Sequence, residues 1–256
     1  MWVYDKRLGR VPKCKSIKSI AWAPAYYAQE KDDGSLDTDT LEHNLATNID
    51  TKAAELLGGL DHRAAQLSFN EDQRGLLAFF IALSLTRVPS FRDGIRNLYS
   101  QIAQYAAEAI GPRLWTGPGP MPRVKAEAKE WVTLEHMIEG ARQIANSLVA
   151  KNWQFFRASS GISFITSDNP VVFSGVAPAH PNSEVVMALT KHMAIVCTPG
   201  SNGLLHPVFD TSRQQVQSMN SRIAKAARTR IFASENSFGI ERLVKKYSNF
   251  EQKIAT

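Results

Sequence analysis

The sequence predicts an α+β protein: an N-terminal helical bundle, followed by a small, mostly antiparallel sheet with a C-terminal helix. Apolar residues recur every three or four positions as far as Leu148, which is the spacing of one helix face. After Asn152, short segments rich in β-branched and aromatic residues are bounded by Gly, Pro and Asn, as strands are. Because helices come first and strands second, the order favours α+β over alternating βαβ units.

A single domain over residues 1–256 is expected. Its helical part covers about 28–150 and its sheet part covers about 152–234. Trp2-Val3-Tyr4 is predicted to be a short strand that joins this sheet.

Two capping signals open the predicted helices. Asp39-x-x-Glu42 resembles a capping box at the start of a helix from about Thr40 to Leu57. Ser68-x-x-Glu71 resembles a second one, before a segment that is apolar on all sides. Such a segment is typical of a buried central helix, and we expect it to break near Val88-Pro89 because proline cannot continue the ladder.

Two more helices complete the first part. One carries an apolar stripe that we interpret as core, and the Gly117–Pro122 stretch after it is predicted to be a linker. The stripe is formed by Ile95, Leu98, Tyr99, Ile102, Tyr105 and Ala109. The last long helix has inward residues at helical spacing, namely Val124, Ala128, Trp131, Leu134, Ile138, Ala141, Ala145 and Leu148.

The sheet part contains six candidate strands and one helix. The helix runs from about Thr211 to Thr229, with Arg213, Arg222, Lys225 and Arg228 on its outer arc. The strands are predicted at Trp153–Ala158, Ile162–Thr166, Val171–Ser174, Glu184–Leu189, Met193–Thr198 and Arg230–Ser234.

The composition is that of an ordinary globular protein, with 44% apolar and 21% charged residues. No apolar run approaches the roughly 20 residues that span a bilayer, and the N-terminus lacks the apolar core of a signal peptide. Cys14 and Cys197 are too few for a disulfide framework. We therefore expect a cytoplasmic protein with reduced thiols and no membrane partner.

The net charge of +6 is unevenly distributed. Residues 1–18 carry six Lys/Arg against Asp5 alone, and ten Lys/Arg face four Asp/Glu from Lys191 to the end. Residues 30–72 are acidic. This asymmetry suggests a basic surface for a polyanion or an acidic partner, although solvated helix faces give the same pattern.

The strongest candidate site is FITSDNPVVF, Phe164 to Phe173, where a polar turn interrupts an apolar segment. An Asx turn explains it locally, whereas a carboxylate at a strand end is also a common position for catalysis or binding. We expect Asp168 to be partly buried at a strand end, bonded to backbone amides of its own turn and within reach of Arg87. Arg87 ends the apolar helix, where it can cap carbonyls or pair with a carboxylate.

No motif for a nucleotide, a metal or a catalytic serine is present. The sequence lacks Gly-x-Gly-x-x-Gly, a P-loop, His-Glu-x-x-His, Cys-x-x-Cys and Gly-x-Ser-x-Gly. His136 and Glu139 lie three apart on a helix, which ordinary exposed helix polarity explains. We assign no metal ligands and no particular cofactor.

Several segments together resemble one family. WVYDK, SIKSIAWAPAYY, LEHNLATNID, FIALSLTRVPSFR and FITSDNPVVF occur in the same order in DUF4238, a bacterial and phage-associated domain of unknown function. The resemblance covers Trp2 to about Ala233 and carries over, as candidate positions, Glu42, Arg87, Trp153, Asp168 and Asn169. Members usually have a His-x-x-Pro segment before the first strand. None of the six histidines of this sequence lies in such a segment. If the activity of the family depends on that histidine, the resemblance implies that this chain is a truncated, diverged or inactive member.

Two functions follow as hypotheses. The first is a nucleic-acid-associated protein, or a degenerate nuclease, in conflict between phage and bacterium. In this hypothesis Asp168, Arg87 and Glu42 are the catalytic candidates. The second is a non-catalytic module that binds or inhibits a protein through the acidic or the basic segments. The ligand-binding candidates are Asn169, Arg222 and Lys225.

Overall fold

A computed structural model describes residues 1–7, 12–16, 19–20, 26–31, 33–61, 63–118, 125 and 132–248. Part of the predicted linker, Gly119–Pro122, lies outside the described residues, and so do Val124, Ala128 and Trp131 of the predicted long helix.

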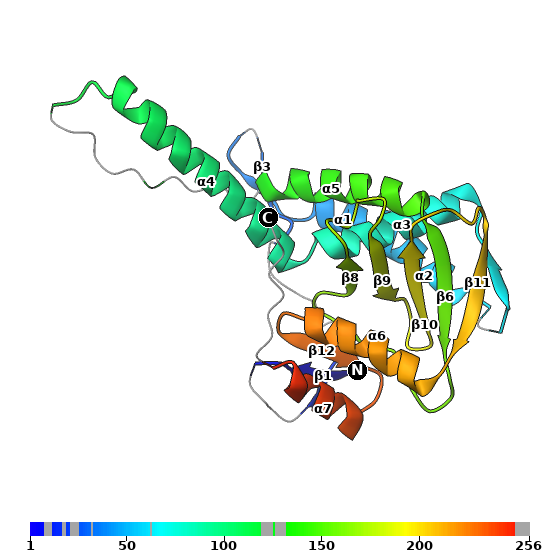
Figure 1. The fold of residues 1–256 in the computed structure, drawn as a ribbon. Coiled ribbons are helices and arrows are strands. Elements are labelled where there is room, and N and C mark those ends of the chain that lie inside the picture. Colours follow the sequence, from blue (N-terminus) through cyan, green and yellow to red (C-terminus); the bar gives the residue numbers. More distant parts are fainter. Residues whose placement is uncertain are drawn as a thin grey trace.

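The fold is mixed α+β, as predicted, but its helices do not form an N-terminal bundle. Short strands precede the first helix, because the N-terminal residues pair with distant segments. These are β1 (Trp2–Asp5), β2 (Lys13–Cys14), β3 (Gln29–Glu30) and β4 (Leu36–Asp37). The helices instead cover sheets that are built from both halves of the chain (Figure 1).

The larger sheet has six strands in the order β5-β11-β6-β10-β9-β8. All described pairs in it are antiparallel except β11 with β6. The strands are β5 (Gln66–Ser68), β6 (Asn152–Ala158), β8 (Val171–Ser174), β9 (Glu184–Ala188), β10 (Met193–Thr198) and β11 (Leu205–Thr211). Neither β5 nor β11 is predicted by the sequence, because β5 is short and Pro207 lies within β11.

Alternation along the strands divides the core in two. Val171 faces the cluster under helices α3 (Glu71–Thr86) and α5 (Val132–Val149), while its neighbour Val172 faces the cluster that includes α6 (Arg213–Ala226). Successive side chains point to opposite faces of a strand, so both faces of the sheet are buried. In Figure 1, α3 and α5 lie across the top of the strands and α6 near their lower ends.

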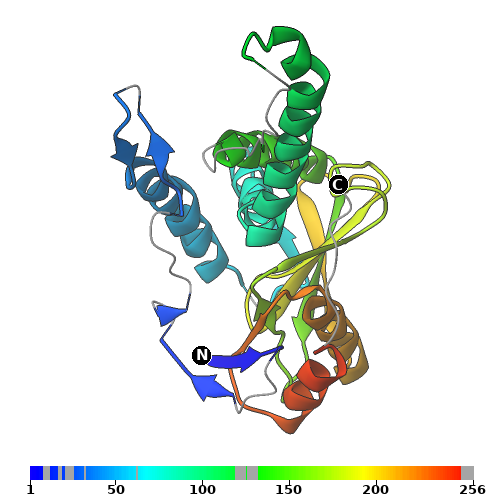
Figure 2. The ribbon, with the colours of Figure 1, turned by 90° about the vertical axis from the view of Figure 1, so that its left-hand side faces the viewer.

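The second sheet joins the two ends of the described chain. Its order is β2-β1-β12-β7, with β7 at Thr166–Ser167 and β12 at Arg230–Ala233. The predicted strand Ile162–Thr166 is therefore wrong for most of its length. Helix α7 (Phe238–Lys246) buries Val244 in the same cluster as Tyr4 of β1. Figure 2 shows β1 and β2 in blue beside β12 and α7 in orange and red.

One helix runs through residues 40–58, close to the predicted Thr40–Leu57. It consists of α1 (Thr40–Leu45), a π-helical turn η2 (Ala46–Asp50) and α2 (Thr51–Gly58). The Thr51 N–H donates to the Ala46 carbonyl, five residues back. The predicted capping box is wrong, because Asp39 caps no amide; the Asp37 carboxylate instead accepts from the N–H groups of Asp39 and Thr40.

Helix α3 ends and α4 (Pro89–Leu114) begins at the predicted break, where Pro89 occupies the first helical position. The capping box of α3 is Asn70 with Gln73, and not Ser68 with Glu71. Helix α4 projects from the body in Figure 1, and most of its apolar stripe is exposed rather than core, while Ile95 and Tyr99 are partly buried. Its exposed fractions are 43% for Leu98, 55% for Ile102 and 75% for Tyr105.

A buried polar cluster closes the end of α5. Arg74, 4% exposed, donates to the carbonyls of Val149, Lys151 and Gly203, and its guanidinium lies 4.6 Å from the centre of the Trp153 ring. The Arg74 Nη1 lies 3.1 Å from Nε2 of the fully buried His206. Since arginine only donates, that nitrogen accepts. Burial, assisted by Arg74, lowers the pKa of His206 to about 4.

No single described helix is long and apolar enough to cross a membrane. Helices α3 and α4 meet the length and composition criteria only as a pair, and they are bent by 64° at their junction. Cys14 is exposed, Cys197 is buried, and both are free thiols.

The neutral His206 should make stability depend on pH. The unfolded chain takes up a proton near pH 6.5, whereas the folded imidazole stays neutral down to about 4. The contribution of the neutral imidazole to the free energy of unfolding is therefore fully present above pH 6.5. It is lost as the pH falls toward 4, which lowers the free energy of unfolding by up to about 3 kcal/mol. Urea unfolding of the wild type and of His206→Gln between pH 4 and 7.5 measures this difference. Parallel pH profiles for the two proteins would contradict it.

Candidate functional site

Three sequence-predicted residues, Glu42, Arg87 and Asp168, line one cavity of about 610 Å³. Its walls come from the α1–η2 helix, the α3–α4 junction, and strands β7 and β12. The tertiary structure thus brings together side chains that are separated by more than 40 residues in the sequence. This size and the mixture of apolar and polar walls are typical of small-ligand sites.

Arg87 has a different partner from the predicted one. Its Nη1 donates to both carboxylate oxygens of Asp50, at 2.9 and 3.0 Å, while Asp168 is held elsewhere. Asp50 ends the π-helical turn η2, whose wider i+5 spacing shifts the following residues relative to an α-helix. Nothing in the sequence distinguishes Asp50 from the other acidic residues of its segment.

Two adjacent tyrosines form another wall. The Tyr26 hydroxyl donates to the Arg87 carbonyl at 2.7 Å, and the Arg92 guanidinium lies 4.2 Å from the centre of the Tyr26 ring. Burial raises the pKa of Tyr27; the charge of Arg87 opposes this shift, and the charges of Asp50 and Glu42 add to it. Tyr27 therefore lies in the field of all three of these charged groups, which the repeated Tyr-Tyr in the sequence does not reveal.

Ser84 contributes the most buried polar group of the wall. Its side chain is 1% exposed, and its hydroxyl has no hydrogen-bond partner within the described part of the chain. A buried hydroxyl without a partner costs about 1–3 kcal/mol. Such a group inside an otherwise apolar helix has no sequence signal of its own.

Asp168 acts as an anchor between two segments. Its carboxylate accepts the backbone N–H groups of Arg228, Thr229 and Arg230 at 2.9, 2.8 and 3.0 Å, and the Thr229 hydroxyl at 2.5 Å. It is partly buried and follows β7, as predicted. The predicted donors are wrong, because the amides belong to the turn between α6 and β12 rather than to its own turn.

Asn169 and Lys6 complete this anchor from the other side. The Asn169 amide donates to the Ala226 carbonyl at 3.1 Å, and the Lys6 ammonium donates to the carbonyls of Lys225 and Ala227 at 3.2 and 2.5 Å. These carbonyls lie at the end of α6, where no intrahelical donor reaches them. The WVYDK and TSDNPV segments therefore meet at one helix end, and Asn169 has a structural contact there.

The remaining predicted residues lie away from the cavity lining. Arg222 pairs with Glu184 at 2.7 Å, and Lys225 is exposed on α6. Trp153 is fully buried, and its indole N–H donates to the Leu148 carbonyl at 2.8 Å. Among the predicted ligand-binding residues, none shares the cavity with Arg87.

The basic segments of the sequence are gathered in one place. We call the part made of β1, β2, α6, β12 and α7, residues 1–7, 12–16 and 213–248, the basic unit. Residues 1–7 and 12–16 carry four Lys/Arg and one Asp, and residues 213–248 carry eight Lys/Arg and two Glu. The basic unit therefore has twelve basic and three acidic residues. The pairing of β1 with β12 brings the N-terminal and C-terminal segments together.

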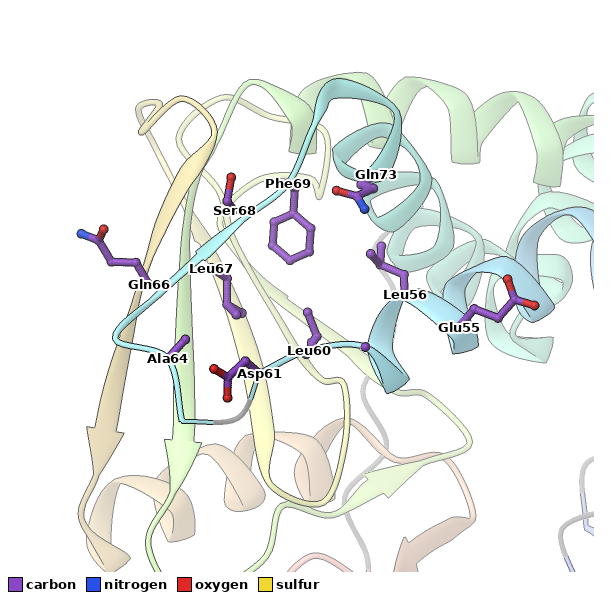
Figure 3. A pocket seen from close by; sticks show the side chains of 11 residues that line it. Glu55, Leu56, Leu60, Asp61, Ala64, Gln66, Leu67, Ser68, Phe69 and Gln73 are labelled. Atoms are coloured by element: carbon purple, nitrogen blue, oxygen red, sulfur yellow. The ribbon is translucent and has the colours of Figure 1, made fainter.

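A second cavity of about 400 Å³ lies between the end of α2 and β5. Figure 3 shows Leu60 and Phe69 at its centre, whereas Glu55 and Gln66 point away on opposite sides. The carboxylate of Asp61 already accepts the Arg63 N–H at 2.8 Å. Within the described residues, no group of three or more His, Cys, Asp or Glu side chains is placed to hold a metal ion. The first cavity, which brings together three of the predicted site residues, is therefore the better candidate site.

Comparison with known proteins gives the family. The model of DUF4238, described as a protein of unknown function, matches residues 1–237. The chain therefore belongs to the DUF4238 family, as its sequence segments indicate. No curated protein and no solved structure shows a significant match to the chain.

The anchor predicts a stability cost for Asp168→Ala. Three backbone amides and one hydroxyl lose their acceptor, so the free energy of unfolding should fall by about 1–3 kcal/mol. Chemical denaturation measures this change. The control is Asp33→Ala, which removes an exposed turn carboxylate and should have a smaller effect. An Asp168→Ala protein that unfolds like the wild type would contradict the anchor.

Proposed function

We propose that the protein is nucleic-acid-associated and that the basic unit provides the contact surface. One observation carries the proposal: antiparallel pairing of β1 with β12 joins the two most basic segments of the chain. In the phage–bacterium conflict that the family resemblance implies, the protein would act by binding a polyanion.

The charges of the basic unit divide into buried, paired and exposed groups. Lys6 caps a helix end, while Arg222 and Arg228 pair with Glu184 and Asp93. The exposed positions include Lys13, Lys15, Arg242, Lys245 and Lys246. These side chains are available to phosphate groups, since Lys and Arg on one surface displace the counterions that condense on nucleic acids.

The proposal predicts salt-dependent binding that needs α7. Binding to duplex DNA, single-stranded DNA or RNA should weaken steeply with salt, with a slope of log K against log [salt] of about −0.9 per phosphate contact on B-DNA. A triple variant Arg242→Gln, Lys245→Gln, Lys246→Gln should reduce that slope by up to about 3. Fluorescence anisotropy titrations between 50 and 200 mM salt measure it.

The matched control neutralises three exposed basic residues outside the basic unit, Lys52, Arg63 and Arg142. This variant should keep the slope of the wild type. The absence of binding at the lowest salt, or an equal loss in both triple variants, would refute the proposal.

The exposed stripe of α4 favours a second candidate function, protein–protein contact. Leu98, Ile102, Tyr105 and Ala109 follow each other at spacings of four, three and four, which is the seam of a coiled coil. All four are exposed on a helix that extends beyond the body. Only Glu108 is charged between Asn97 and Ile110, so two copies of the helix would pair without like-charge crowding. A second copy of the chain is therefore the partner that we propose.

This second candidate predicts a dimer that depends on the stripe. Light scattering should give a mass of twice 28.4 kDa for the wild type, and 28.4 kDa for Leu98→Ser with Ile102→Ser. The control, Asn97→Ser with Gln101→Ser, changes exposed polar residues of the same helix and should remain dimeric. A monomeric wild type at the highest attainable concentration would rule out self-association.

A further inference from the structure

We propose that the cavity at Arg87 binds a small organic molecule that carries an oxyanion, a carboxylate or a phosphate, at one end and a hydrogen-bond donor at the other. This inference is independent of nucleic-acid binding by the basic unit. It rests on polar groups of the cavity that have no partner within the described residues.

Arg87 provides the first of these groups. Both of its bonds to Asp50 come from Nη1, so Nε–H and the second amino group make no hydrogen bond to the described residues. These two donors form the edge of a guanidinium that binds carboxylate or phosphate with two parallel hydrogen bonds. Asp50 holds the group in place, while that edge is left for a ligand.

Two hydroxyl groups add donors to the same wall. Within the described part of the chain, the buried Ser84 hydroxyl has no hydrogen-bond partner and the Tyr27 hydroxyl makes no hydrogen bond. A guanidinium edge with nearby hydroxyl donors is suited to an oxyanion, which has lone pairs for several donors. The π-helical turn that positions Asp50 is a further indication, because such turns occur frequently at functional sites.

Glu42 defines the other end of the ligand. Its carboxylate lines the cavity and makes no hydrogen bond or ion pair with any described residue, so it can accept from a hydroxyl or an ammonium group. Leu45, Val88 and Phe232 also line the cavity and provide apolar wall for the body of the molecule. A volume of about 610 Å³ accommodates a metabolite-sized compound.

The charge of the cavity disfavours a nucleic-acid backbone, so a single oxyanion would be held by directed hydrogen bonds and not by net charge. Two arginines, Arg87 and Arg230, face three carboxylates, Glu42, Asp50 and Asp168. Asp168 is saturated by backbone donors, and Asp50 neutralises Arg87. A surface of this balance attracts no polyanion, but it can orient a ligand with an acidic end and a donor end.

The test uses the full-length protein with sodium phosphate and sodium acetate as probes, against sodium chloride at constant ionic strength. Calorimetric and NMR titrations should show binding of at least one of the two ions, and the preferred ion identifies the ligand as a phosphate or a carboxylate. Tyr27→Phe and Ser84→Ala each remove a single hydroxyl and should weaken that binding about tenfold. Arg87→Lys should weaken it at least as much, because lysine lacks the bidentate edge.

Two controls separate the cavity from the basic unit. Tyr247→Phe removes a tyrosine hydroxyl beyond α7, and the triple variant of Arg242, Lys245 and Lys246 removes basic charge; both should bind the ion like the wild type. The proposal is overturned if neither ion binds, if Tyr27→Phe and Ser84→Ala bind like the wild type, or if only the triple variant loses binding. Normal ion binding together with absent nucleic-acid binding would support this inference and refute the function proposed for the basic unit.

Discussion

Three consecutive amides between the end of α6 and the start of β12 donate to one carboxylate, that of Asp168, and much of the arrangement depends on this interaction. A carboxylate can accept several N–H donors at once, whereas a water or a neutral side chain would leave some of them without an acceptor. The bond pattern fixes the start of β12 beside β7, which in turn gives β1 its partner. Thr229 and Arg230 are thereby placed in the cavity wall.

The need of buried hydrogen-bonding groups for a partner also explains the buried cations. Arg74, Lys151 and Lys6 are each at most 4% exposed, and backbone carbonyls at the ends of helices or in loops accept their hydrogen bonds. Carbonyl groups at a helix C-terminus carry partial negative charge, so they stabilise a buried cation without a carboxylate. These three buried cations therefore supply hydrogen bonds to backbone carbonyl groups that would otherwise lack a donor.

The cavity and the basic unit differ in how far their charges are balanced. In the cavity, Arg87 is neutralised by Asp50, and the remaining donors converge on a confined volume. On the basic unit, twelve cationic side chains face three acidic ones and many are exposed. In the two proposals, the first arrangement would select a ligand by geometry and the second would attract a polyanion by charge. The two proposals therefore concern different ligands, and each can fail without the other.

The sequence by itself determined what depends on neighbours along the chain. It predicted the helix at 40–57, the break at Pro89, the strands at Val171–Ser174 and Met193–Thr198, and the strand-end position of Asp168. Periodicity and proline act locally, so their signals are present in the sequence. Glu42, Arg87 and Asp168 were identified through family resemblance and polarity, and they do share a cavity.

Only the tertiary structure decided which distant groups meet. Asp50, at the end of the π-helical turn, pairs with Arg87 in place of Asp168, and the amides that Asp168 binds come from about 60 residues further along the chain. The stripe of α4 has a helical period whether or not a neighbour covers it, so its exposure could not be predicted from spacing. Hydrogen-bond partners and burial are properties of the packed chain. A sequence pattern specifies the groups that need a partner, and the fold specifies the partner.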